Sequence, residues 1–321
     1  MVLRLGVSVG IIYLVFRKID FHDTLSAIRG SDKQFLFFAF NLNFLTYFFC
    51  FNRWRQLLET IGVSVPTKKL VSSFSGGIFF NLSPISTLGG DMARSFDLTA
   101  YAKKPRKIVA TVLLDRLSGY VGLALLVIAA VAFGGGMART KSVLVSAGVI
   151  VGILVAVLLV LFNPSVYALV NRLLHAPSSG KLREPLKNVH DELYAFRRHK
   201  AVMAKNLGFS LLVQITGPIA TYYTAHALGV NLDMRHFFVI IPIIGAITML
   251  PISVGGLGLR DGSMLIFFRQ LGVPDHTIIA MSLLGFLFVV AYGVIGGLVY
   301  VLTVHNRRLQ PHPSPPLHAS H

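Results

Sequence analysis

Most of this chain consists of apolar stretches about as long as a membrane is thick. The stretches at 117–133, 143–162, 207–228 and 277–304 are each close to the ~20 residues that a helix needs to cross ~30 Å of hydrocarbon. The mean hydropathy is +0.68 and only 13% of the residues are charged, which is far from the composition of a soluble domain. Alternating ten-residue segments, the signature of a membrane β-barrel, are absent from the sequence. The sequence therefore predicts an all-α polytopic membrane protein.

We expect six spans and two interrupted segments. The predicted spans are residues 2–16, 35–51, 109–133, 142–162, 205–228 and 277–304, and the interrupted segments are 70–100 and 237–272. The first apolar run is short enough for a signal peptide. However, Arg17 and Lys18 follow it in place of a small-residue cleavage site, so we interpret it as a retained helix.

The distribution of basic residues predicts the orientation. The polar segment 163–204 is rich in Lys and Arg, and the positive-inside rule places it in the cytoplasm. Threading the chain outward from it places both termini in the cytoplasm, with 20 Lys and Arg on the cytoplasmic side and 8 outside. Arg53 belongs to this cytoplasmic count, and Trp54 is interpreted as an anchor at the membrane interface. We expect a multi-pass protein of the plasma or inner membrane.

The net charge of +17 raises the question of a nucleic-acid partner. Such binding needs basic residues on one solvated face, with groups beside them that read or stack on bases. Here the charges lie between apolar spans, which favours topology signals and contacts with anionic lipids. We therefore expect membrane lipids as partners, no nucleic acid, no cofactor and no metal. The sequence leaves the oligomeric state open, including a homo-oligomer.

An internal repeat divides the chain. Residues 84–94 and 251–260 both contain Pro-Ile-Ser, then Gly-Gly, then Arg. In the expected topology the first interrupted segment enters from the cytoplasm and the second from outside, which is the inverted-repeat plan of many secondary transporters. The sequence predicts one membrane repeat over 1–133, a second over 142–304, and a disordered tail over 305–321.

The two repeated motifs predict breaks in the helices. Pro removes a backbone donor and Gly favours irregular backbone, which membrane proteins tolerate only inside the protein or along a wet cavity. An anionic group would bind well to the amides of helices that restart after the breaks. The alternative is a simple loop between two separate spans. The residues expected to line the route are Asn81, Ser86, Gly89, Gly90, Ser253, Gly255 and Gly256.

Charged residues near membrane depth complete the candidate site: Asp91, Arg94, Asp115, Arg116, Arg260 and Asp261. Each costs ~3 kcal/mol alone at a helix centre, so we expect them to be paired and to face the interior. One interpretation of these charges is structural ion pairing within the protein, and it applies above all to Asp115 and Arg116. For Arg94 and Arg260 we favour contact with an anionic headgroup, because a guanidinium fork matches phosphate geometry.

These motifs also carry a resemblance. Gly89-Gly90-Asp91 with Arg94, Asp115-Arg116 with Gly119, the stretch 250–261 and Arg53-Trp54 resemble the lysylphosphatidylglycerol synthase transmembrane-region family, also called flippase-like domains. The resemblance covers nearly the whole chain and implies a lipid-flipping protein. Asp261 departs from the Glu that is usual there. No soluble aminoacyl-transfer domain follows residue 304, so we do not expect synthase activity.

Enzyme signatures are few in this sequence. His-Glu-x-x-His, Gly-x-Ser-x-Gly and Walker-type motifs are absent. Asp91 and Asp261 could form a carboxylate pair, but Leu88 replaces the first Gly of the intramembrane aspartyl protease motif. We predict a translocase for a lipid or lipid-linked headgroup rather than an enzyme. The alternatives are an intramembrane lipid-modifying enzyme, a transporter of a small soluble anion, and a membrane scaffold that uses segment 163–204.

Overall fold

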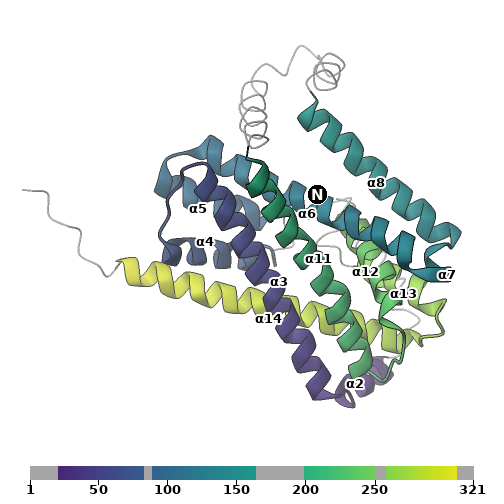
Figure 1. The fold of residues 1–321 in the computed structure, drawn as a ribbon. Helices are drawn as coiled ribbons and strands as arrows, with labels where there is room; N and C mark the ends of the chain where they lie inside the picture. Colours follow the sequence, from purple (N-terminus) through teal and green to yellow (C-terminus); the bar gives the residue numbers. More distant parts are fainter. Residues whose placement is uncertain (1–20, 83–88, 164–198, 250–257, 309–321) are drawn as a thin grey trace, which may run out of the picture.

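A computed structural model describes residues 21–82, 89–163, 199–249 and 258–308, and all regular structure in these ranges is helical (Figure 1). The predicted span 2–16 and most of the segment 163–204 lie outside the described residues. The helices are α2 (Phe21–Arg29), α3 (Lys33–Thr60), α4 (Thr67–Phe80), α5 (Gly89–Ala102), α6 (Pro105–Phe133), α7 (Gly135–Ala138), α8 (Lys141–Phe162), α11 (Lys200–Ala227), α12 (Met234–Met249), α13 (Leu259–Arg269) and α14 (Asp275–Arg308).

Local sequence signals explain where several helices begin and end. The Asp32 carboxylate caps α3 by accepting a hydrogen bond from the Gln34 N–H at 2.8 Å. Pro105 lies at the start of α6, where its missing N–H costs no helical bond. Gly229 and Gly272 follow α11 and α13 with φ of +78° and +77°, a backbone region that favours glycine and ends a helix.

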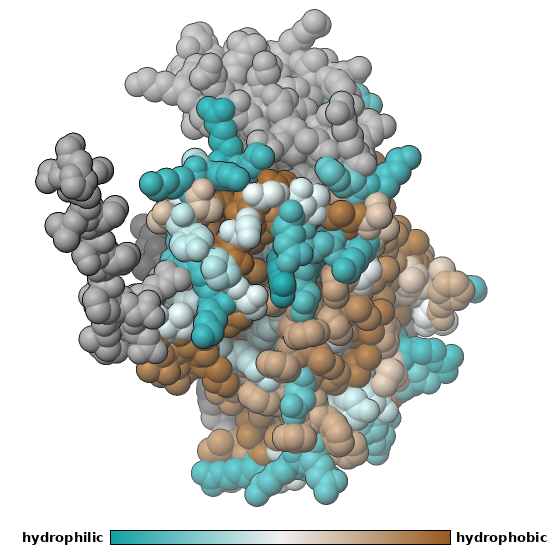
Figure 2. All heavy atoms as spheres, turned by 60° about the vertical axis from the view of Figure 1, so that its left-hand side comes forward, coloured by the Kyte–Doolittle hydropathy of each residue, from teal (hydrophilic) through white to brown (hydrophobic). Residues whose placement is uncertain are grey.

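Within the described residues, four helices are long and apolar enough to cross a membrane: α3, α6, residues 143–160 of α8, and α14 up to Thr303. The outward face of α8 carries exposed Val145, Val149 and Ile153 at helical spacing. Figure 2 shows apolar side chains over most of the middle of one face, with polar side chains mainly toward its upper part and lower edge. The protein is therefore an integral membrane protein, as predicted, with lipid-facing side chains on its surface.

The centre of the molecule is an antiparallel pair formed by α3 and α11. The Asp32 N–H donates to the Ala227 carbonyl at 2.9 Å, and the Gln56 side chain donates to the Val202 carbonyl at 2.7 Å, so the two helices run in opposite directions. The predicted span 205–228 is helical, but α11 is not among the helices of the described residues that are long and apolar enough to cross a membrane. Polar residues such as Ser210 and Thr216 are buried in α11 and form hydrogen bonds with side chains of α3, so they are not exposed to lipid.

Two antiparallel hairpins flank this pair. In the first, Lys69 near the start of α4 forms an ion pair with Asp97 near the end of α5. In the second, the ring of Phe237 at the start of α12 lies 5.4 Å from that of Phe268 at the end of α13. The first hairpin follows the C-terminus of α3 and the second follows the C-terminus of α11. Because α3 and α11 are antiparallel, the hairpins open toward opposite ends of the molecule.

The long helix α14 packs against both α4 and α13 and thereby connects the two hairpins (Figure 1). Glycine allows its close approach to α4. A Cβ atom at Gly296 would lie 2.7 Å from the Ser75 carbonyl oxygen, and one at Gly293 would lie 2.2 Å from a Leu82 methyl carbon. Close backbone packing through small residues is the usual way in which membrane helices associate.

The predicted boundaries need one substantial correction. The span expected at 35–51 continues as α3 to Thr60, because Arg53 and Trp54 belong to the protein interior and not to a loop. The helices on either side of the first expected break end at Phe80 and begin at Gly89, and on either side of the second they end at Met249 and begin at Leu259. Residues 83–88 and 250–257 lie outside the described residues.

Candidate functional site

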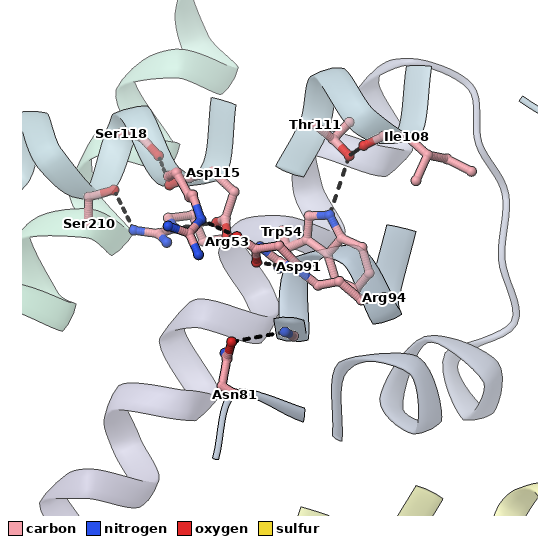
Figure 3. A network of polar contacts seen from close by, with 12 residues as sticks. Arg53, Trp54, Asn81, Asp91, Arg94, Ile108, Thr111, Asp115, Ser118 and Ser210 are labelled. Atoms are coloured by element: carbon pink, nitrogen blue, oxygen red, sulfur yellow. Dashed lines mark hydrogen bonds and ion pairs between the residues drawn. The ribbon is translucent and has the colours of Figure 1, made fainter. Parts of the chain in front are cut away.

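Five charged side chains meet where α3, α5 and α6 pack together (Figure 3). We call this group the buried charge cluster. It consists of Arg53 from α3, Asp91 and Arg94 from α5, and Asp115 and Arg116 from α6.

Asp115 is the central carboxylate of the cluster. One of its oxygens accepts a hydrogen bond from Arg53 Nε at 2.6 Å, and the other accepts one from Arg94 Nη2 at 3.0 Å. The three side chains are 6–7% exposed. Charge-assisted hydrogen bonds of this length are the strong kind, and here they offset the cost of removing the ions from water.

Asp91 connects this centre to the outer part of the cluster. Its carboxylate accepts a hydrogen bond from Arg94 Nε at 3.0 Å and also forms ion pairs with Arg94 and Arg116. The side chain of Asp91 is 14% exposed and that of Arg116 is 29% exposed. The cluster is therefore closed on the side of Arg53 and accessible on the side of Arg116.

Helix α11 holds Arg53 in place through small and polar residues. Arg53 Nη1 donates to Ser210 Oγ at 3.1 Å, and the Gln214 amide donates to the Gly119 carbonyl at 3.0 Å. A Cβ atom at position 119 would lie 3.2 Å from Arg53 Nη1. Glycine at this position gives the guanidinium room to reach Asp115.

Trp54 forms an aromatic surface under Arg94. The Arg94 guanidinium carbon lies 4.6 Å from the centre of the Trp54 ring, within cation–π range. The indole is fully buried, and its N–H donates to Thr111 Oγ1 at 3.3 Å. The prediction that Trp54 anchors the chain at the membrane interface is therefore wrong, because its N–H already has an internal partner.

Gly90 places Asp91 and Arg94 at the start of α5. Its N–H donates to Asn81 Oδ1 at 3.0 Å, which connects the end of α4 to the start of α5. A Cβ atom at Gly90 would lie 2.1 Å from the Gly77 carbonyl oxygen. Gly89 and Gly90 are thus in the first turn of a helix rather than in an irregular break, because the close crossing of α4 and α5 requires small residues there.

Arg260 and Asp261 lie at the start of α13. The Asp261 carboxylate accepts from the Gly258 N–H at 3.0 Å, and it also accepts from Ser282 Oγ on α14. Arg260 donates to Ser282 Oγ at 3.0 Å and to Asp261 at 3.3 Å. Asp261 therefore stabilises the first turn of α13, where a negative charge is favourable. We call Arg260, Asp261 and Ser282 the α13 site.

The structure brings the predicted site residues into two groups. Asn81, Gly89, Gly90, Asp91, Arg94, Asp115 and Arg116 lie in or beside the buried charge cluster, whereas Arg260 and Asp261 form the α13 site. Within the described ranges, α4 and α5 do not pack against α12 or α13. Ser86, Ser253, Gly255 and Gly256 lie outside the described residues, so the expected meeting of the two breaks stays a prediction.

Asp115 and Arg116 are ion-paired, as expected, and their partners lie on other helices. Adjacent residues on a helix point in different directions, so the two side chains do not face each other. Sequence analysis missed Arg53 and Ser210. The signal for Ser210 was present: Asn206, Ser210 and Gln214 recur every four residues on an otherwise apolar helix, which marks one polar face.

Comparison with known proteins agrees with this architecture. The sequence model of the lysylphosphatidylglycerol synthase TM region matches residues 1–297. Two proteins of Methanothermobacter thermautotrophicus, each described as a UPF0104 membrane protein, are similar to the chain. One is 24% identical over 84% of this chain and 86% of its own length, and the other is 22% identical over 85% and 84%. The chain therefore belongs to the lysylphosphatidylglycerol synthase transmembrane-region family.

Proposed function

We propose that the protein moves a lipid, or the headgroup of a lipid-linked molecule, across the plasma or inner membrane, as a flippase does. The buried charge cluster carries this proposal. It lies between helices of which two, α3 and α6, are apolar enough to cross a membrane. Each ionised group costs ~3 kcal/mol at the centre of a lone membrane helix, and groups of this kind usually mark the path of a substrate.

The positions of the two sites along their helices support a route across the membrane. Arg53 lies seven residues before the end of α3, or roughly 10 Å at 1.5 Å per residue. Arg260 lies nine residues before the end of α13, or roughly 14 Å, and that end is on the opposite side of the molecule. A headgroup that crosses would thus meet one polar site from each side, while its acyl chains stay in lipid.

The two hairpins support a transporter architecture. Helices α4 and α5 have 14 residues each and α13 has 11, or about 21 Å and 17 Å, which is shorter than the ~30 Å hydrocarbon core. Helical hairpins that open to opposite sides fit the inverted-repeat plan, in which substrate sites lie near discontinuous helices. In the sequence, the two Pro-Ile-Ser motifs fall between α4 and α5 and between α12 and α13.

The same geometry favours transport over hydrolysis. An aspartyl hydrolase needs two carboxylates within reach of one bond, and Asp91 and Asp261 belong to different sites. Each of the two also accepts hydrogen bonds from an arginine beside it. A carboxylate that is engaged by a neighbouring arginine in this way is less available to act on a substrate bond.

Translocation in sealed vesicles tests the proposal. The purified full chain is reconstituted with a trace of phosphatidylglycerol that carries a fluorophore on one acyl chain, and dithionite is added to bleach the outer leaflet. We expect a second, protein-dependent phase of bleaching as the inner pool crosses, with and without imposed proton or sodium gradients. Bleaching that stops at the level of protein-free vesicles under every gradient would exclude lipid translocation. Uptake of soluble glycerol phosphate by those vesicles would then indicate a transporter of small anions.

A further inference from the structure

We propose that a groove between α6 and α12 binds one acyl chain of a phospholipid, in the leaflet at which α12 begins. The groove shares no residue with the buried charge cluster or with the α13 site. The inference goes beyond the proposed function, because a lipid tail can bind in this groove whether or not a headgroup crosses the membrane.

The groove lies where the end of α6 meets the start of α12, and its volume is about 340 Å³. On α6 it extends from Phe133 back to Leu126, seven residues or roughly 10 Å at 1.5 Å per residue. Leu126 and Val239 line it as buried residues, and the small side chain of Ala129 leaves space between the two helices. The volume is within the range of small-molecule sites.

The chemistry of the lining fits an amphiphile. Apart from Arg235 at the start of α12, the side chains that line the groove are apolar, among them Phe133 and Phe238. Apolar cavities exclude water and take up apolar ligands. Arg235 is paired with Asp233 at 2.8 Å, so this end of the groove is polar without calling for a counter-ion. The groove therefore fits a hydrocarbon chain with a polar group at one end and does not select the charge of that group.

The surroundings of the groove identify the hydrocarbon. Helix α6 is long and apolar enough to cross a membrane, and its residues Leu125 and Ile128 are 39% and 48% exposed. Phe133, at the end of the groove, is 83% exposed. Lipid tails are the medium around such side chains, so an acyl chain enters the groove directly from the bilayer.

The space is a particular feature of this helix contact. Helix α14 has the place in the second predicted repeat that α6 has in the first, and it packs against α4 as α6 packs against α12. A Cβ atom at Gly293 would lie 2.2 Å from Leu82, and one at Gly297 would lie 2.6 Å from the Phe79 ring. Glycine thus closes the contact of α14 with α4, whereas the contact of α6 with α12 leaves room. An acyl chain there restores the dispersion contacts that an empty space forfeits.

Photo-crosslinking in vesicles tests this inference. The full-length protein is reconstituted in phosphatidylcholine with a trace of the same lipid carrying a diazirine in the middle of one acyl chain, and mass spectrometry locates the adducts after irradiation. We expect adducts at Phe133 and Phe238 to exceed those at Val145 and Val149, on the exposed face of α8, by about tenfold. Ala129→Phe should lower the groove adducts to the level of α8, because the ring fills the space.

The matched control is Ala156→Phe, which makes the same change at an exposed position of α8 and should leave the groove adducts at the wild-type level. Phosphatidylglycerol with the same labelled chain should give the same adducts, because the tail makes the contact, and a dependence on the headgroup would overturn the assignment. Equal adducts at the groove and on α8 in the wild type would show ordinary boundary lipid and overturn the inference, even if Ala129→Phe cannot be purified. Groove adducts that persist in Ala129→Phe would also contradict it.

Discussion

Asp115 stabilises the helix bundle at the scale of single residues, because two arginines from different helices depend on its two oxygens. In Asp115→Asn both guanidinium groups stay buried while their shared counter-ion is lost. Removing one partner of a buried ion pair costs ~3–5 kcal/mol, so we expect a clear drop in the apparent melting temperature of the purified protein in detergent.

The control for this substitution is Asp233→Asn, which makes the same chemical change in an exposed pair with Arg235. Exposed ion pairs contribute little to stability, so the apparent melting temperature of the control should equal that of the wild-type protein. Equal melting of the wild type and Asp115→Asn would show that the cluster does not hold the helices together.

The membership of the cluster could be predicted only in part from the sequence. Charges inside apolar runs predicted Asp91, Arg94, Asp115 and Arg116 as members, because the membrane makes unpaired charges expensive. The partners that come from other helices could not be predicted, since Arg53 reaches Asp115 across 62 positions of sequence, and only tertiary packing decides which helix faces which. Arg53 itself was assigned to a loop because it follows an apolar run and precedes another basic residue.

At the scale of helices, Gly90 determines how closely α4 and α5 cross. A Cβ atom there would lie 2.1 Å from the Gly77 carbonyl oxygen and 2.5 Å from Asn81, so the backbone would have to move. We expect Gly90→Ala to destabilise the protein by about 1–3 kcal/mol, as overpacking does in other cores, and to shift Asp91 and Arg94 with the helix.

Gly148 on α8 provides the matched comparison, because a Cβ atom there meets nothing within 4 Å. Alanine is a better helix former than glycine by about 0.5–1 kcal/mol, so Gly148→Ala should leave the apparent melting temperature unchanged or raise it. If Gly90→Ala behaves in the same way, the close crossing of α4 and α5 is not required.

The helices illustrate which signals a sequence carries well. Apolar length predicted α6, α8 and α14 to within a few residues, whereas the breaks expected at the Pro and Gly motifs stay predictions where they fall on residues 83–88 and 250–257. The polar face of α11 was harder to interpret. A helix inside the bundle tolerates Asn, Ser and Gln where it packs against other helices, whereas a lipid-facing helix does not, and the sequence alone does not say which kind α11 is. The short helix α2 was not predicted, since its nine residues are too few and too polar to register as a membrane span, although Phe21, Leu25 and Ile28 recur at helical spacing.

At the scale of the whole molecule, the basic residues predict how the protein is oriented in the membrane. Even without the buried Arg53, Lys69 and Arg94, basic residues remain in excess on the side that we assign to the cytoplasm. Two exposed loop positions, Ser64 after α3 and Asn231 after α11, lie on opposite sides of the α3–α11 pair.

Single cysteines test this orientation in a Cys50→Ser background. In intact cells a membrane-impermeant maleimide should label Asn231→Cys, whereas Ser64→Cys should react only after permeabilisation. The opposite pattern would reverse the topology and place the buried charge cluster nearer the outer face.

Passage of a headgroup across the membrane by way of the buried charge cluster can be measured directly. The most direct test is the rate at which labelled phosphatidylglycerol in sealed vesicles becomes accessible to dithionite, with wild-type protein and with Arg116→Gln at equal reconstitution. We expect the wild type to accelerate crossing over protein-free vesicles, and Arg116→Gln to be slower than the wild type by about tenfold or more, because one charge-assisted contact is lost. Equal rates for the wild type, Arg116→Gln and protein-free vesicles would contradict the account.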